Sequence, residues 1–472
     1  MPKKNRKTTP APPTRGKTAA HANRLRSASI EHTGALFAPY VRFEQPPNAR
    51  NRVFGPATTF WLFLWQVLSG NLSCSETVQS ALAWLCRSKK SKASPNTAGY
   101  CKARARLEEK ILKKVARQVA GDLQERAPRD PLFAGRRVRI VDGTGLSMPD
   151  TPENQKRFPQ SPRQKPGCGF PTMRLVALFC LASGAIVRVA FGSLSNHERT
   201  LFHQIWEELR EGDIVLADRG FCSFADFFLL LQRGVDCLMR NHQRRSTGPR
   251  VIKRLGEGDC LVAWRRTGKH PDWLEKETWK NMPMEMTVRQ IQFAVEITGF
   301  RTRNITLVTT LLDPSLYPKT HFVQLYRRRW LAELFLRDVK ISLGMDALKC
   351  KSPGMVQKEL MMYLIAYNLI RTLMLRAAQS AGAPDPLRIS FKRTADALRQ
   401  WAPHIALAQG HQARALTSAL LHAIGRLCVP KRPNRVEPRA IKRRRKNYQL
   451  LNKPRKQFRE IPHRNKYKAA LS

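Results

Sequence analysis

Four side chains between residues 326 and 340 have types and a spacing that suit phosphate chemistry. Tyr326, Arg329 and Lys340 lie seven residues before, four before and seven after Glu333. At about 100° per residue, these offsets fall within about 40° of Glu333 on an α-helix, so the four side chains would share one face. Such a face could bind a metal ion through its carboxylate, and phosphate through its two cations and its hydroxyl. A solvated helix with charge pairs four residues apart is the alternative interpretation.

Two aspartates that follow predicted buried strands supply further acids. Asp142 follows a strand at 137–141 and Asp218 follows a strand at 213–217, and the two would meet if these strands are neighbours in a sheet. Paired divalent ions about 3.5–4 Å apart, which stabilise the attacking and leaving oxygens of a phosphoryl transfer, need several oxygen ligands. We therefore expect the catalytic, metal-binding residues to be Asp142, Asp218 and Glu333, holding two Mg²⁺ or Mn²⁺ ions.

Other polar residues near these positions have simpler interpretations. Asp150 lies in a Pro-rich loop, where it would form a turn or a helix cap. Asp213 begins the strand whose other end carries the second aspartate, so it would lie at the opposite end of the sheet. Asp338 would lie on a different helix face from Glu333, and His197 is expected to cap a helix.

The elements that must position the acids follow one order along the chain. Apolar runs predict strands at 137–141, 173–181, 185–191, 213–217 and 235–239. Helical periodicity predicts helices at 197–211 and 223–233. Three consecutive strands followed by alternating helices and strands match the ribonuclease H-like fold. We therefore expect an α/β fold, with a mixed five-stranded sheet flanked by helices.

A change of composition between residues 241 and 318 predicts a β-rich insertion before the helix that carries Glu333. Strands are expected there at 288–296 and 304–312. Helical periodicity then resumes from 321 to about 343, and again from 355 to 379.

Composition and periodicity divide the chain into seven segments. We expect a disordered basic arm at 1–28, a helical N-terminal DNA-binding domain at 29–130, a catalytic core at 131–240 and 319–380 interrupted by the insertion at 241–318, a helical region at 381–428 and a basic tail at 429–472. In the N-terminal domain, 96–126 is expected to be one long amphipathic helix. The basic residues at its start, 100–106, either face DNA or lie on a solvated surface.

The charge of the 472-residue chain predicts a polyanionic partner. It has 84 Lys and Arg against 35 Asp and Glu, which gives a formal net charge of +49. Binding to nucleic acid would relieve the resulting self-repulsion. Ten cysteines without a CxxC pair indicate reduced thiols rather than disulfides or zinc ligands. No apolar stretch is long enough to cross a bilayer, so we expect a soluble intracellular protein with no membrane partner.

The spaced motif Tyr-x2-Arg-x3-Glu-x6-Lys resembles the signature of bacterial insertion-sequence transposases of the DDE type, in the insertion-sequence-four family. It is met without a gap by Tyr326, Arg329, Glu333 and Lys340. The Asp-Gly-Thr that begins at Asp142 resembles the first aspartate motif of that family, and the Asp-Arg-Gly-Phe that begins at Asp218 resembles the second. The resemblance covers roughly residues 55–380.

The resemblance implies a DNA transposase that binds the terminal inverted repeats of its element. It would cleave a strand with water and then join the new 3′-hydroxyl to target DNA, with three acids holding two divalent ions. Tyr326, Arg329 and Lys340 carry over as contacts to phosphates at the transposon ends. DNA is the implied partner, and a homodimer in a synaptic complex, cytoplasmic and associated with the prokaryotic nucleoid, is the implied active form.

The insertion is implicated in this family in handling a DNA hairpin and flipping a base. Trp264, Trp273 and Trp279 are candidates for that contact, and an ordinary small core is the other interpretation. Two alternative functions stay open at this point. One is a structure-selective nuclease of the ribonuclease H-like fold, which would cleave without joining strands. The other is a domesticated DNA-binding protein without catalysis.

Overall fold

The computed structural model describes residues 31–44, 46, 52–87, 94–241, 249–266, 269–294, 304–382, 385–430, 454 and 457. The predicted basic arm at 1–28 lies outside these residues, and so does most of the predicted basic tail at 429–472. None of the helices in the described ranges combines the length and the apolar character needed to cross a membrane.

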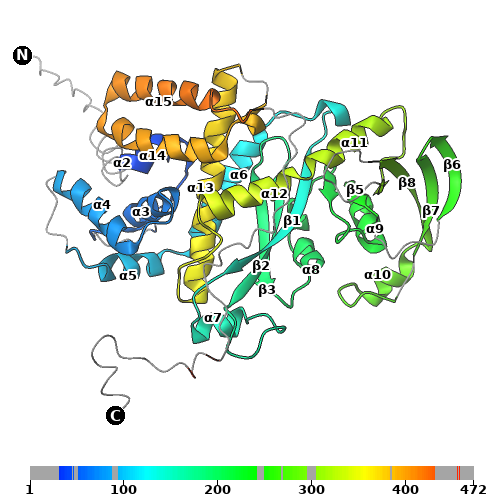
Figure 1. Cartoon of the computed structure of the whole chain (residues 1–472), viewed down its shortest axis with the longest axis horizontal. Coiled ribbons are helices and arrows are strands. Elements are labelled where there is room, and N and C mark those ends of the chain that lie inside the picture. Colours follow the sequence, from blue (N-terminus) through cyan, green and yellow to red (C-terminus); the bar gives the residue numbers. More distant parts are fainter. Residues whose placement is uncertain are drawn as a thin grey trace, which may run out of the picture.

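A single mixed sheet of nine strands runs from the middle of the molecule to one end of it (Figure 1). The strands are β1 (Val138–Ser147), β2 (Thr172–Cys180), β3 (Ile186–Ser193), β4 (Ile214–Ala217), β5 (Asp236–Arg240), β6 (Arg250–Gly256), β7 (Asp259–Arg265), β8 (Glu285–Ala294) and β9 (Asn304–Thr309). Their order across the sheet is β3-β2-β1-β4-β5-β9-β8-β7-β6. The fold is therefore mixed α/β, as expected.

The strands that precede the two aspartates are neighbours, as the sequence predicted. β1 pairs in parallel with β4 from Val138↔Ile214 to Ile140↔Leu216. The five strands expected in the core are contiguous, but the sheet does not end with them. It continues because β9 pairs antiparallel with β5, so the predicted five-stranded sheet is part of a sheet of nine.

Helices gather at the other end of the molecule, beside the first strands of the sheet (Figure 1). They are α2 (Glu31–Phe37), α3 (Pro56–Leu68), α4 (Cys74–Arg87), α5 (Ala98–Arg106), α6 (Glu109–Glu125), α13 (Pro353–Ser380), α14 (Phe391–Leu407) and α15 (Gly410–Gly425). The apolar side chains of α13 are buried around most of its circumference, and it packs against α3, α6, α14 and α15. A helix that is apolar all round belongs inside a protein, and α13 therefore joins these helices to the sheet.

The long helix predicted at 96–126 is broken into α5 and α6. Leu107 leaves the helical conformation, with φ −57° and ψ 125°, and its side chain is buried. Burial of this side chain redirects the chain between two helices that pack on different partners. Within α5, Tyr100 and Arg104 face the core, whereas Lys102 and Arg106 are exposed. Only some of the basic residues at 100–106 are therefore placed on the surface.

The remaining helices lie between the strands or follow the last strand. They are α7 (Pro152–Arg157), α8 (Glu198–His203), α9 (Phe224–Gln232), α10 (Lys276–Asn281), α11 (Lys319–Arg328) and α12 (Leu331–Arg337), with single turns at Ala38–Tyr40, Pro131–Phe133, Trp206–Glu208 and Pro386–Arg388. The helix predicted at 197–211 is much shorter in the structure. His197 caps α8, its side chain accepting a hydrogen bond from the Arg199 N–H as expected.

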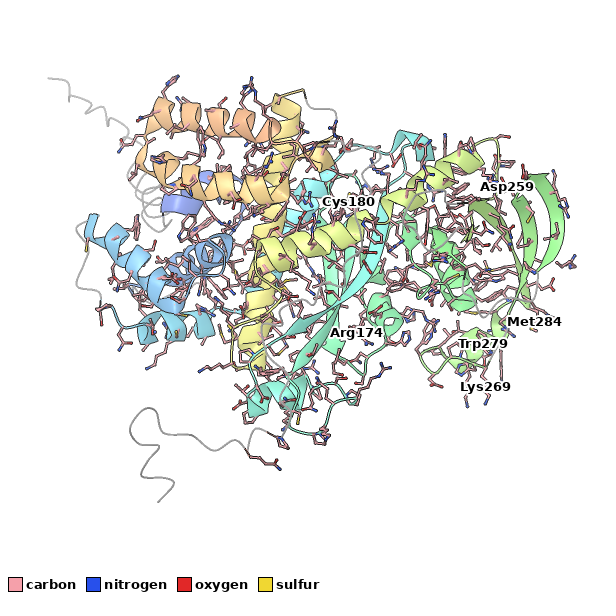
Figure 2. The ribbon with its side chains drawn as sticks, in the orientation of Figure 1. Arg174, Cys180, Asp259, Lys269, Trp279 and Met284 are labelled. Carbon is pink, nitrogen blue, oxygen red and sulfur yellow. The ribbon has the colours of Figure 1, made fainter. Side chains whose placement is uncertain are left out.

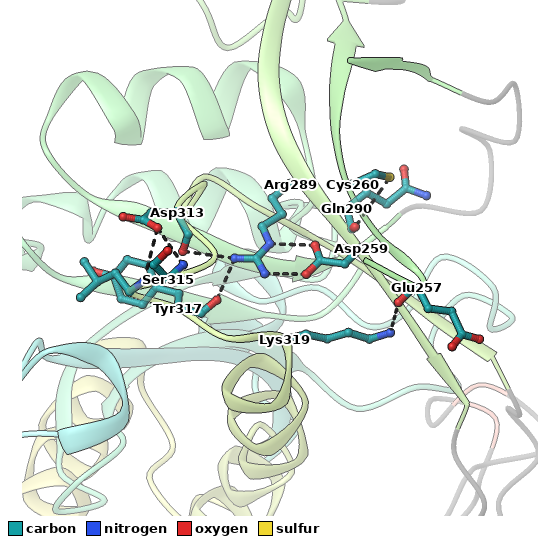
Figure 3. A network of polar contacts seen from close by, with 10 residues as sticks. Glu257, Asp259, Cys260, Arg289, Gln290, Asp313, Ser315, Tyr317 and Lys319 are labelled. Carbon is teal, nitrogen blue, oxygen red and sulfur yellow. Dashed lines mark hydrogen bonds and ion pairs between the residues drawn. The ribbon is translucent and has the colours of Figure 1, made fainter. Parts of the chain in front are cut away.

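A buried network fastens the insertion strands to the start of α11 (Figure 3). The Arg289 guanidinium on β8 makes two hydrogen bonds to the Asp259 carboxylate on β7, at 2.8 and 2.5 Å. It also donates to the Tyr317 carbonyl at 2.7 Å and lies over the Phe322 ring of α11, 5.1 Å from its centroid. The Lys319 ammonium donates to the Glu257 carbonyl at 2.5 Å. The insertion is thus anchored to the element that leads to Glu333.

Candidate active site

The strand that carries Asp142 is longer than predicted. Its parallel pairing with β4 stops at Ile140, but its antiparallel pairing with β2 continues through Asp142↔Ala177 to Ser147↔Thr172. Asp142 therefore lies within β1 rather than after it, at the point where β4 has ended and one edge of β1 is open. The carboxylate is half-buried and accepts a hydrogen bond from the Gly143 N–H at 2.9 Å.

Asp218 lies in the turn that follows β4. It is two residues beyond Leu216, just as Asp142 is two residues beyond the partner of Leu216, so the parallel register brings both aspartates to the same level of the sheet. The turn is held by the Gly220 N–H, which donates to the Asp218 carboxylate at 2.8 Å. The side chain is half-buried.

The helical part of the site is not the continuous helix that was predicted. α11 ends at Arg328, α12 begins at Leu331, and the chain continues from Asp338 to Ser342 as a π-helical turn. The Arg329 N–H donates to the Tyr326 carbonyl at 3.1 Å, which tightens the junction between α11 and α12. The two halves have different packing partners: the Arg328 side chain pairs with Asp130 at 2.6 Å, and Phe335 packs on Phe179.

The four motif side chains lie on both sides of this break. Tyr326 lies on α11, Arg329 in the junction between α11 and α12, Glu333 on α12 and Lys340 in the π turn. The backbone stays in the right-handed helical region at Arg329 and Asp338, and Arg329 still pairs with Glu333 four residues further on. The shared face of all four side chains stays a prediction.

Electrostatic contacts place Asp142 among the other charged groups of the site. Burial raises the pKa of Asp142 to about 6. The Gly143 N–H and the Arg329 guanidinium oppose this rise in pKa, whereas the negative charges of Glu333 and Asp218 add to it. Such mutual effects on pKa require the charged groups to lie near one another. The structure thus brings the three predicted acids and Arg329 into one electrostatic neighbourhood.

Arg329 lies between the acids and the tyrosine. Its guanidinium donates to the Glu333 carboxylate at 3.3 Å and lies 5.9 Å from the centroid of the Tyr326 ring. Burial raises the pKa of Tyr326, while the cations of Arg329 and Arg240 oppose that rise and Asp218 adds to it. Tyr326, Arg329 and Glu333 are therefore part of the same site as the aspartates.

Lys340 contacts the strand that carries Asp142. Its ammonium donates to the Thr144 hydroxyl at 3.0 Å and to the Gly145 carbonyl at 3.1 Å, and it pairs with Asp346 at 2.9 Å. Thr144 points to the same face of β1 as Asp142, because the two residues are two positions apart along the strand. The lysine is thus held beside the first aspartate, although the π turn rather than a regular helix puts it there.

Two residues of this neighbourhood did not emerge from the sequence, namely Asp346, which pairs with Lys340, and Arg240, which ends β5 near Tyr326. Thr144 belongs to the Asp-Gly-Thr motif, but its contact with Lys340 was not predicted. Arg240 could have been found, because it ends a parallel strand next to the one that precedes Asp218. Asp346 had no signal, because its role depends on how the chain turns after the π turn.

The acids have the donor chemistry of a Mg²⁺ or Mn²⁺ site, but they are not gathered to ligating distance. Among the described residues, no group of three or more His, Cys, Asp and Glu side chains is close enough to hold a metal ion. Repulsion between like charges opposes the approach of the carboxylates to one another, and the Arg329 guanidinium pairs with Glu333. Carboxylate oxygens are ligands that Mg²⁺ and Mn²⁺ prefer, and the three carboxylates would have to approach one another to bind the same ion.

Two other aspartates occupy structural positions, as the sequence suggested. Asp213 forms a buried ion pair with Arg139, at 3.1 Å, at the opposite end of β1 and β4 from the acids. Asp338 pairs with the buried Arg371 at 2.8 Å, at the start of the π turn.

The three tryptophans of the insertion differ in their surroundings. Trp264 is buried and packs edge-on against Phe227, with ring centroids 5.0 Å apart, which favours the core interpretation. Trp273 is half-buried against the His203 ring, at 4.0 Å between centroids. Figure 2 shows Trp279 near Met284 at the edge of the insertion, where the Arg266 guanidinium lies 4.4 Å from the Trp279 ring.

A family model and a curated relative both indicate a transposase. A family model described as the transposase DDE domain matches residues 133–369. The transposase InsG of insertion sequence element IS4, from Escherichia coli (strain K12), is 26% identical to the chain over 348 residues, which are 72% of this chain and 75% of that protein. A solved structure of the piggyBac transposase synaptic complex with hairpin DNA aligns with a TM-score of 0.40 and 9% identity, over 88% of this chain and 84% of that chain.

Proposed function

The chain belongs to the DDE transposases, in the insertion-sequence-four family, and it is a DNA transposase; we propose that Asp142, Asp218 and Glu333 are its catalytic residues. The observation that carries this assignment is the parallel register of β1 and β4, which brings Asp142 and Asp218 to the same level of the sheet. The nearby charges of Glu333 and Asp218 add to the rise in the pKa of Asp142, although these residues are far apart in the sequence.

The catalytic layer is proposed to have the ribonuclease H-like fold. The contiguous order β3-β2-β1-β4-β5, with β1 parallel to β4 and antiparallel to β2, supports this proposal. The helices before residue 130 are proposed to form the DNA-binding domain, and residues 241–318 to form an insertion that contacts the transposon end. The exposed Lys102 and Arg106 of α5 support the first of these assignments.

Two Mg²⁺ or Mn²⁺ ions are the proposed cofactors, held by the three acids. Bound there, they would supply Lewis-acid stabilisation to the oxygens of a phosphoryl transfer. The chain itself must bring its carboxylates together, and the Glu333 carboxylate is paired with Arg329. We propose that Arg329 leaves Glu333 when DNA binds and donates its planar fork to a phosphate, which frees the Glu333 oxygens.

Tyr326 and Lys340 are proposed to contact phosphates at the reacting end together with Arg329. The Lys340 ammonium is a point charge fixed beside β1, suited to a phosphate next to the scissile one. The half-buried Tyr326 keeps its proton, because desolvation raises its pKa, so its hydroxyl can donate a hydrogen bond to a phosphate oxygen.

The proposed substrates are a target DNA and the terminal inverted repeats of the element that encodes the chain. Strand cleavage by water would give a 3′-hydroxyl that attacks the target, within a homodimer that holds two ends together in the cytoplasm. The net charge of +49 supports binding to DNA and predicts a steep dependence on salt, with a slope near −0.9 in log K against log salt for each neutralised phosphate.

The test uses a DNA fragment that carries the element's own ends, incubated with the purified chain and Mg²⁺ or Mn²⁺. We expect cleavage at the ends followed by joined products on a strand-transfer gel. Cleavage without joining would instead indicate a structure-selective nuclease. If Glu333→Gln cleaves as fast as the parent, the proposed catalytic set is wrong.

A further inference from the structure

The π turn after α12 decides where Lys340 points. The Leu343 N–H donates to the Asp338 carbonyl at 3.3 Å, a bond that spans five residues instead of four and so places one extra residue in the turn. An extra residue rotates everything after it relative to a regular helix. Lys340 lies inside this turn, so its direction depends on the turn being kept.

A buried ion pair holds the first residue of the π turn. The Arg371 guanidinium, on α13, donates to the Asp338 carboxylate at 2.8 Å, and the two side chains are 3% and 13% exposed. Three aromatic rings enclose Arg371, namely those of Phe335, Tyr367 and Phe391, with centroids 4.7, 5.2 and 5.2 Å from its central carbon. Arg371 therefore has little freedom to follow Asp338 if the turn rearranges.

The same arginine is tied to the sheet. Its Nε donates to the Tyr367 hydroxyl at 3.0 Å, and that hydroxyl donates to the Gly184 carbonyl, in the turn between β2 and β3, at 2.8 Å. Gly184 has φ +71°, and a Cβ there would lie 3.1 Å from the Phe335 ring and 3.2 Å from the Arg371 central carbon. A chain of contacts thus runs from the sheet through Tyr367 and Arg371 to the π turn.

Stability alone does not account for this pair. Burying two charges has a desolvation cost that their attraction often only offsets, and apolar side chains of similar volume commonly stabilise a fold as well or better. The pair lies at the start of an irregular helical turn, where it can fix which side chains of the turn face the sheet. In this turn the Lys340 ammonium contacts the Thr144 hydroxyl and the Gly145 carbonyl, beside Asp142.

We propose that Arg371 is a positioning residue: through Asp338 it fixes the π turn, and thereby holds the Lys340 ammonium against β1. The inference rests on the proposed function of Lys340 as a phosphate contact. It adds that this contact is set by a residue on α13, in the core beneath the site, which would not itself touch DNA.

The first test follows the position of Lys340 without DNA. Lys340 is 16% exposed in its side chain, so its acetylation by acetic anhydride, followed by mass spectrometry of the folded chain, should be slow. In Asp338→Asn, which keeps the shape but weakens the pair, we expect Lys340 to react several times faster while exposed lysines such as Lys102 react as before. An unchanged rate at Lys340 would overturn the proposal, whatever the DNA chemistry does.

The second test separates positioning from folding. Arg371→Met leaves Asp338 buried and unpaired, so both thermal stability and end cleavage should fall. The double variant Asp338→Leu/Arg371→Met should recover the melting temperature but still cleave about tenfold more slowly than the parent at saturating DNA. Adding Lys340→Met should slow the parent by a similar factor and the double variant hardly at all, because coupled residues are not additive.

The matched control is the buried pair Arg139 and Asp213, which has the same chemistry at the other end of β1. Its double variant Arg139→Met/Asp213→Leu should recover cleavage together with stability. If the Asp338 and Arg371 double variant does the same, or if Lys340→Met slows it as much as it slows the parent, Arg371 is only structural. If Lys340→Met leaves parental cleavage unchanged while the acetylation result holds, the phosphate role of Lys340 fails and the positioning of its side chain stands.

Discussion

The two sides of the active site are built on different physical rules. On the sheet side, Asp142 and Asp218 stand two residues beyond paired positions of parallel strands, so the backbone register alone aligns them. On the helix side, Arg329 lies in the junction between α11 and α12, Glu333 on α12 and Lys340 in the π turn. Arg328, the last residue of α11, pairs with Asp130, which lies outside these helices.

The difference teaches where local pattern is enough to place a side chain. Strand pairing fixes neighbours residue by residue, and a register error would move every side chain to the wrong face. A helix keeps its angular relations only while it stays regular, and a single inserted residue changes the direction of all later side chains. The following predictions test this contrast, beginning with the largest expected effect.

The sheet-side acids should be equivalent in catalysis. Asp142→Asn and Asp218→Asn should each slow end cleavage about a thousandfold, because charge stabilisation by bound metal contributes several kcal/mol and each 1.36 kcal/mol is tenfold in rate. Single-turnover cleavage measures the rates, and Glu153→Gln, at an exposed acid in the first turn of α7, is the control. A large difference between the two aspartates would break the symmetry that the register implies.

The turn that supports Arg371 should be far less tolerant than the strand beside Asp142. Gly184→Ala should lower the free energy of unfolding by about 2–3 kcal/mol, because φ is positive and the new Cβ meets the Phe335 ring. Gly143→Ala should cost less, since its Cβ meets only the carboxylate end of Glu198, which can move. Urea titration compares the two variants, and equal costs would contradict this explanation.

The geometry of Arg329 should matter beyond its charge. Arg329→Lys should slow cleavage about tenfold, because a lysine keeps the charge but lacks the planar fork that pairs with two phosphate oxygens. The loss of about 1.4 kcal/mol is the amount expected for one charge-assisted hydrogen bond. Arg327→Lys, an exposed neighbour on α11, should cleave like the parent. Equal rates for both variants would remove the specific role of Arg329.

An exposed pair in the insertion should contribute little. Arg250 and Glu285 lie 3.1 Å apart with side chains 69% and 41% exposed, and Glu285→Gln should change the free energy of unfolding by less than about 1 kcal/mol. By comparison, breaking the buried Arg289 and Asp259 pair with Arg289→Met should cost about 3–5 kcal/mol. Denaturant titration in the same buffer tests both values.

The sequence was sufficient where periodicity and strand order carry the information. The five core strands, their contiguity and the neighbourhood of Asp142 and Asp218 could be predicted, because apolar strands and parallel crossovers have few arrangements. The antiparallel junction of β9 with β5 could not, since no local pattern says where an insertion rejoins a sheet. The π turn was not predicted, because the residue that begins it, Asp338, pairs with Arg371, which lies 33 residues further along the chain.

The central claim, that three acids distant in sequence form one metal site, has a direct test. Fe²⁺ with ascorbate and peroxide cuts a protein backbone close to where the ion is bound, and excess Mg²⁺ should suppress the cuts by competition. We predict cuts near Asp142, Asp218 and Glu333 together, all lost when any one of the three is replaced by its amide. Cuts at only one of these segments, or cuts that survive Glu333→Gln, would contradict a shared site.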